Sequence, residues 1–107
     1  MSKLNKNTQD LYKAILSLDD LNEAERFFRD LLTAGEIEEF GRRWRAAIML
    51  NEGQSYVEIH QATKLSSTTI ARISRWLRHG RNGYRLALDR SNYSSKDVAN
   101  RVDSNKS

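Results

Sequence analysis

The chain has 107 residues, enough for one small domain, and a net charge of +4 from 18 Lys and Arg against 14 Asp and Glu. It has no cysteine, which excludes disulfides and thiolate metal sites and is compatible with an intracellular protein. No apolar run is long enough to span a membrane, and the start, MSKLNKNTQD, is not a signal peptide, so we expect a cytoplasmic protein.

Positive charge is concentrated in the middle of the chain. Residues 1–40 carry five Lys and Arg and nine Asp and Glu, a net charge of −4, whereas residues 41–90 carry ten and three, a net charge of +7. Residues 91–107 carry three and two, a net charge of +1, which completes the total of +4. A basic region beside an acidic one indicates an anionic partner, with nucleic acid the first choice. On charge alone, solvated helix faces are the alternative explanation.

The sequence predicts an all-α fold, because it has no proline and no stretch that alternates as a strand would. The first helix is expected from Thr8 to Leu18, and Asp20 caps a second helix with Glu23 three positions later. Apolar residues of the first helix cover an arc of about 200°, wider than a helix packed on one side requires. A second copy of the chain is the simplest cover for the extra flank, so the sequence predicts a homodimer.

A third helix begins at a second capping box, in which Thr33 is followed by Glu36. It is expected to run to about Glu52, since Gly53 suits the position just after a helix. Residues 1–54 are therefore assigned to an N-terminal helical dimerisation region.

Residues 55–80 have the pattern of a helix-turn-helix. Ser55 and Glu58 form another capping box before a short helix, and Ser66 caps a longer helix after a tight turn. The turn contains Lys64 where this motif usually has a glycine in the left-handed conformation, at a cost on the order of 1 kcal/mol. The small core between the two helices is predicted to contain Ile59, Leu65, Ile70, Ile73 and Leu77.

The second helix of this motif is expected to lie in the major groove of double-stranded DNA. A 100° spacing places its apolar residues on one face and its hydroxyls and arginines on the other. We expect base-edge contacts from Ser67, Thr68, Ala71 and Arg72, and phosphate contacts from Ser55, Tyr56, His60, Arg75 and Arg78, with Ser66 and Thr69 completing the candidate DNA-binding residues. A helical hairpin that only packs is the alternative.

The rest of the chain carries few signals. A turn at RNG (81–83) and a short C-terminal helix are expected within residues 81–90, and residues 91–107 are expected to form a polar, disordered tail. The two histidines, His60 and His79, have no partner ligand or nucleophile at a suitable spacing, so we expect no metal site, no catalytic residue and no enzyme.

Residues 31–77, LLTAGEIEEFGRRWRAAIMLNEGQSYVEIHQATKLSSTTIARISRWL, resemble the tryptophan repressor family, and more closely its tryptophan-repressor-like branch. The resemblance implies a six-helix, all-α fold, an intertwined homodimer and two recognition helices in successive major grooves. It implies a sequence-specific transcriptional regulator, a repressor, that binds a palindromic operator. A helical protein–protein interaction module that does not use its helix-turn-helix for DNA is the alternative.

The resemblance also indicates a candidate effector pocket. In the family, free tryptophan is held by two arginines that match Arg43 and Arg72, and a threonine in the same pocket matches Thr33. Here Ile73 stands at the family's glycine position beside the indole, and Trp76 stands at a serine position. We therefore expect no cofactor: L-tryptophan, or another small-molecule effector, is indicated by the resemblance alone, and Trp76 either fills the pocket or packs in the core.

Overall fold

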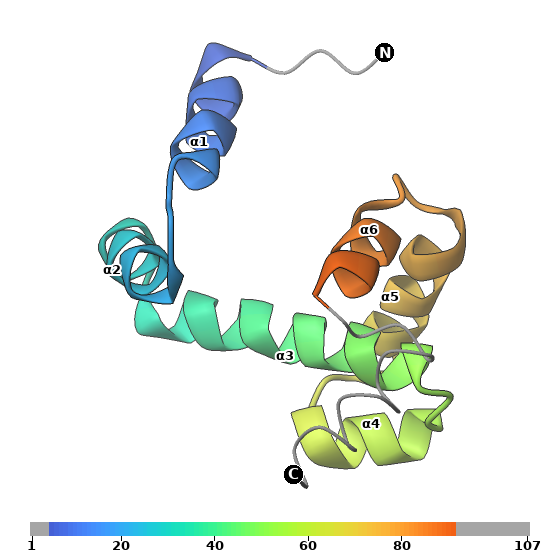
Figure 1. The fold of residues 1–107 in the computed structure, drawn as a ribbon. Coiled ribbons are helices and arrows are strands. Elements are labelled where there is room, and N and C mark those ends of the chain that lie inside the picture. The colour runs from blue at the N-terminus through green and yellow to red at the C-terminus, as the bar shows by residue number, and fades with distance from the viewer. Residues whose placement is uncertain (1–4, 92–107) are drawn as a thin grey trace, which may run out of the picture. The chain divides into compact units, whose positions relative to one another are not determined.

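The computed structural model describes residues 5–91, which form six α-helices and no strand (Figure 1). The helices are α1 (Lys6–Leu16), α2 (Leu21–Leu31), α3 (Ala34–Asn51), α4 (Tyr56–Thr63), α5 (Ser67–His79) and α6 (Gly83–Arg90). The chain divides into two compact units, one ending at Ile37 and the other beginning at Glu38. The predicted all-α, six-helix fold is confirmed. Except for Ser91, the predicted tail lies outside the described residues.

The first helix begins and ends two residues earlier than predicted. The Asn5 side chain accepts a hydrogen bond from the Thr8 backbone N–H at 2.8 Å, which makes Asn5 the N-cap of α1. The predicted start at Thr8 is therefore wrong by two residues, and the cap lies at Asn5. At the other end, the Ser17 hydroxyl donates to the Ala14 carbonyl at 2.6 Å and the helix stops at Leu16.

Large apolar side chains of the first unit are exposed. Asp20 caps α2 as predicted, accepting from the Glu23 N–H at 2.9 Å, yet neither α1 nor α2 contains a buried residue. Leu16 and Leu21 are 83% and 86% exposed, and Tyr12 is 51% exposed. The first unit, taken by itself, therefore leaves large apolar side chains of α1 and α2 uncovered.

The predicted capping box opens α3. The Glu36 N–H donates to the Thr33 hydroxyl at 3.1 Å, and the Thr33 N–H donates to the Glu36 carboxylate at 2.9 Å. Gly53 follows the helix with a φ of +84°, a left-handed conformation in which glycine has no steric penalty. The last two turns of α3 supply four consecutive buried residues to the second unit: Ala46, Ala47, Ile48 and Met49.

The core of the second unit lies where the end of α3 meets α4 and α5. It comprises Ala46, Ala47, Met49, Ile59, Leu65, Ile70 and Ile73, with Trp44, Leu50 and Tyr84 packed against it. Four of the five predicted core residues are thus confirmed, but Leu77 is only partly buried. Leu88 of α6 is fully buried as well. Full burial of one such aliphatic side chain is worth about 1.5–3 kcal/mol, so this core fixes α5 against its neighbours.

Among residues 5–91, none of the helices combines the length and the apolar character needed to cross a membrane.

Candidate nucleic-acid interface

Helix α4 is held at its start by a complete capping box. The Glu58 N–H donates to the Ser55 hydroxyl at 3.1 Å, and the Ser55 N–H donates to the Glu58 carboxylate at 2.8 Å. The pKa of Glu58 is lowered because its carboxylate accepts hydrogen bonds from Ser55, with the backbone N–H of Ser55 contributing more than its side chain. The Ser55 hydroxyl, predicted to contact phosphate, is therefore already part of the helix cap.

The turn between α4 and α5 is fixed by side chains as well as backbone. Lys64 has a φ of +64°, as predicted for this position, and its N–H donates to the His60 carbonyl at 2.7 Å. The buried Thr63 hydroxyl donates to the Ile59 carbonyl at 2.7 Å and accepts from the Leu65 N–H at 3.2 Å. The His60 Nδ1–H donates to the Leu65 carbonyl at 2.7 Å, which leaves Nε2 as the ring nitrogen available for a partner.

Two predicted DNA-binding hydroxyls also belong to the cap of α5. The Ser66 hydroxyl accepts from the Thr69 N–H at 3.1 Å and donates to the Thr69 hydroxyl at 3.1 Å. These two hydroxyls therefore stabilise the start of α5 at Ser67.

The two faces of α5 have opposite chemistry. Ile70, Ile73 and Ser74 are buried against the second unit. On the other side, the predicted base-contact and phosphate-contact residues are all exposed: Ser67, Thr68, Ala71, Arg72, Arg75 and Arg78. Across the part of the chain that the structure describes, no carboxylate pairs with Arg75 or Arg78. Their charge is available to an external anion.

Two residues of the predicted effector pocket are in direct contact. The Arg72 guanidinium lies over the Trp76 ring, 5.9 Å from its centroid, in a cation–π contact. Arg43 makes an ion pair with Glu39 at 3.3 Å, and Ile73 faces the core instead of a cavity. Thr33 belongs to the first unit and is used in the cap of α3.

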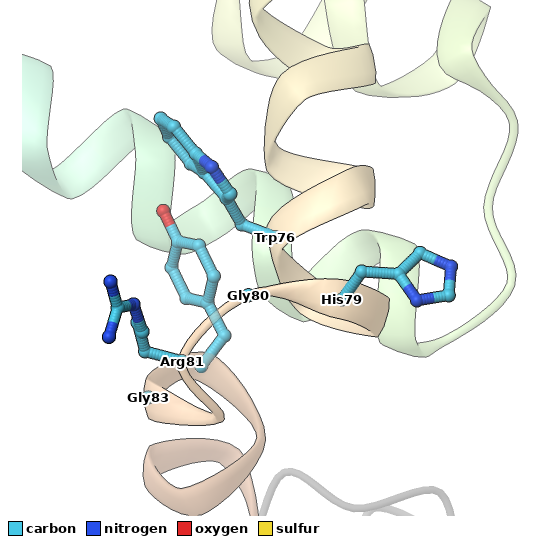
Figure 2. A pocket seen from close by; sticks show the side chains of 6 residues that line it. Trp76, His79, Gly80, Arg81 and Gly83 are labelled. Carbon is cyan, nitrogen blue, oxygen red and sulfur yellow. The ribbon is translucent and has the colours of Figure 1, made fainter. Parts of the chain in front are cut away.

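The side chain of Trp76 is 45% exposed, so it does not pack in the core of this chain, which was one of the two predicted alternatives. It lines a pocket of about 640 Å³ at the turn between α5 and α6, together with His79, Gly80, Arg81, Gly83 and Tyr84. Figure 2 shows Trp76 and Arg81 on one side of this turn, with His79 pointing away from them. The turn passes so close to α5 that a Cβ on Gly80 would lie 2.5 Å from the Trp76 carbonyl oxygen.

Tyr84 connects this pocket to α3. Its ring stacks on Trp44, with centroids 6.4 Å apart, and burial raises the pKa of its hydroxyl while the charge of Arg43 opposes the shift. Tyr84 is not among the predicted site residues, because its position depends on the packing of α6 against α3 and α5, which no local sequence pattern reveals.

A second hollow lies on the helix-turn-helix itself. It has a volume of about 350 Å³ and is lined by Tyr56, Val57, His60 and Gln61 of α4 and by Ser67 of α5. Val57 is 66% exposed and was not among the predicted site residues. The sequence feature that could have identified Val57 is an apolar side chain on the outer face of α4, where polar residues are expected. Over residues 5–91, no group of three His, Cys, Asp or Glu side chains could hold a metal ion.

Comparison with known proteins covers most of the chain. Residues 6–92 match a family model described as Trp repressor protein. The uncharacterized protein YerC of Bacillus subtilis strain 168 is 45% identical over 85 residues, which are 79% of this chain and 82% of YerC. A TrpR-like protein from Eubacterium eligens superposes with a TM-score of 0.76 at 40% identity, over 80% of this chain and 89% of that one. A candidate Trp repressor from Staphylococcus aureus superposes with a TM-score of 0.79 at 35% identity, over 85% and 91%.

Proposed function

This chain belongs to the Trp repressor family of helix-turn-helix regulators, and on that premise we propose that it is a sequence-specific, double-stranded-DNA-binding transcriptional regulator. The main support for the proposal is the outer face of α5, where five arginine or hydroxyl side chains are exposed while Ile70 and Ile73 anchor the helix in the core. Hydroxyl and guanidinium groups match base edges in the major groove, and arginines match phosphates.

The proposed assembly is a homodimer that represses transcription from a palindromic operator. The open apolar surface of α1 and α2, with Tyr12, Leu16 and Leu21 exposed, supports a partner chain on the first unit. Two-fold symmetry would present two copies of α5 to two half-sites, and a regulator bound across a promoter blocks transcription. The proposed place of action is the cytoplasm, which the bacterial sources of the matched proteins support.

We further propose that DNA binding needs no corepressor. Arg72, one of the two arginines that the family uses for the tryptophan carboxylate, is already stacked on Trp76. Arg43 is already paired with Glu39. A side chain attached to the protein loses no association entropy when it occupies such a position, so Trp76 is an inexpensive substitute for a free indole.

A helical protein-interaction module is the second candidate, and the same exposed apolar side chains on α1 and α2 favour it. Its DNA binding would be weak and without sequence preference, whereas its protein contact would tolerate salt.

Selection from a random pool of double-stranded DNA separates the two. The full chain is mixed with the pool, bound duplexes are recovered over several rounds, and the selection is repeated with L-tryptophan present. A regulator enriches one palindromic motif in both selections. Recovery of unrelated sequences only would overturn the proposed function, and a motif that appears only with L-tryptophan would overturn the corepressor-free mechanism.

A further inference from the structure

The hollow on the helix-turn-helix lies beside the N-terminus of α5. Tyr56, Val57, His60 and Gln61 occupy positions i, i+1, i+4 and i+5 of α4 and so share one face of that helix. Ser67, the first residue of α5, completes the wall. The early residues of α5 are the ones that approach base edges in a helix-turn-helix complex, so in such a complex the hollow would lie beside the bases.

The chemistry of the hollow differs from that of the surrounding surface. Val57 is 66% exposed and Tyr56 is 40% exposed, while Gln61 and Ser67 contribute neutral polar groups. An exposed valine cannot donate a hydrogen bond to phosphate. In the major groove, the C5 methyl group of thymine is the apolar feature that distinguishes one base from the other three.

Two parts of the wall, His60 and the start of α5 at Ser67, are held in place before any partner binds. The His60 ring is fixed by its hydrogen bond to the Leu65 carbonyl at 2.7 Å, and the Ser66 cap fixes the start of α5. A rigid site loses little conformational entropy on binding, so a contact as small as one methyl group produces a measurable preference.

Building on the proposed DNA-binding function, we infer that this hollow accepts the C5 methyl group of one thymine in each half-site. Val57 is then a specificity-determining residue, and the net positive charge of residues 41–90 brings the DNA to it.

Deoxyuridine replacement tests the inference, because deoxyuridine differs from thymidine only by the missing methyl group. In the selected palindrome, each symmetry-related pair of thymines is replaced in turn, and dissociation constants are measured by fluorescence anisotropy. Burial of one methyl group corresponds to about a fourfold change in affinity. Replacing one symmetry-related pair removes two methyl groups, so we expect the affinity to fall about fifteenfold at one pair. Tight binding of the palindrome with no sensitive pair would overturn this inference and leave the proposed function standing. Failure to bind any palindrome would overturn both.

Variants at position 57 assign the effect to the hollow. Val57→Ala should abolish most of the penalty at the sensitive pair, whereas Val57→Ile, which keeps the apolar wall, should retain it. Leu86→Ala is the matched control, since Leu86 is an exposed apolar residue of α6 outside the hollow. Circular dichroism confirms that each variant folds. A penalty that persists in full in Val57→Ala would show that the methyl group is read elsewhere.

Discussion

Replacing Lys64 with glycine is expected to stabilise the folded chain by about 1 kcal/mol, because the turn of the helix-turn-helix holds a lysine in a left-handed conformation. Its φ and ψ are 64° and 12°. An L-residue with a β-carbon loses roughly 1–2 kcal/mol in that region, and the extra chain entropy of glycine offsets about 0.5–1 kcal/mol of the gain. The Lys64 side chain is exposed, and its backbone hydrogen bond to the His60 carbonyl survives the substitution.

Thermal unfolding followed by circular dichroism measures the effect. For a domain of this size, about 1 kcal/mol corresponds to a rise in Tm of roughly 4–8 °C. Asn82→Gly is the matched control, since Asn82 has nearly the same backbone, with a φ of 67°, but asparagine tolerates that region better than lysine. The rise should therefore be smaller for Asn82→Gly. An unchanged or lower Tm for Lys64→Gly, or a larger gain at Asn82, would refute the reasoning.

The remaining predictions concern DNA, assembly, the effector and pH. Arg72→Ala should lose roughly 1–3 kcal/mol on the selected site and relax its sequence preference, and wild-type binding would refute the groove assignment. Arg78→Ala should weaken all duplexes about equally and reduce the salt slope by about one unit. Ile15 is one of the apolar residues of α1, and Ile15→Asp should abolish the proposed dimer in sedimentation, because an unpaired charge buried in an apolar interface costs several kcal/mol. A dimeric variant with normal DNA binding would contradict the interface. L-tryptophan should give no heat in calorimetry, while Trp76→Ala should bind DNA more weakly; micromolar tryptophan binding that raises DNA affinity would restore a corepressor mechanism. Because folding lowers the pKa of Glu58, its carboxylate stabilises the folded chain at any pH above the ordinary pKa of 4.5. This stability is lost as the pH falls through the lowered pKa. Glu58→Gln should remove that part of the pH dependence in urea unfolding, and an unchanged profile would contradict it.

The helix starts were predictable where a cap is a local feature. Asp20, Thr33, Ser55 and Ser66 each bond to a backbone N–H three residues later, and this spacing is visible in the sequence. Asn5 makes the same kind of bond to the Thr8 N–H, although the predicted helix begins only at Thr8.

Burial on α5 was harder to predict because it depends on neighbouring helices. A helical wheel groups Ile70, Ile73, Trp76 and Leu77 in one arc, and the structure buries only the first two completely. Trp76 remains 45% exposed at the edge of the pocket beside α6.

The contacts that define the candidate sites could not be predicted from local sequence patterns either. The stacking of Arg72 on Trp76 depends on rotamers, and the hollow around Val57 depends on the angle between α4 and α5. Both the rotamers and the angle between the helices are set by three-dimensional packing.

The salt dependence of binding tests the central claim most directly. Fluorescence anisotropy compares the selected palindrome with a scrambled duplex of equal length at several salt concentrations. If Arg75, Arg78 and one further cationic side chain of each protomer contact phosphates, a dimer neutralises about six phosphates. A plot of the logarithm of the binding constant against the logarithm of the salt concentration should then have a slope of about −5. The palindrome should be clearly preferred at every salt concentration. Equal affinity for both duplexes, or binding that does not change with salt, would contradict a sequence-specific DNA-binding function.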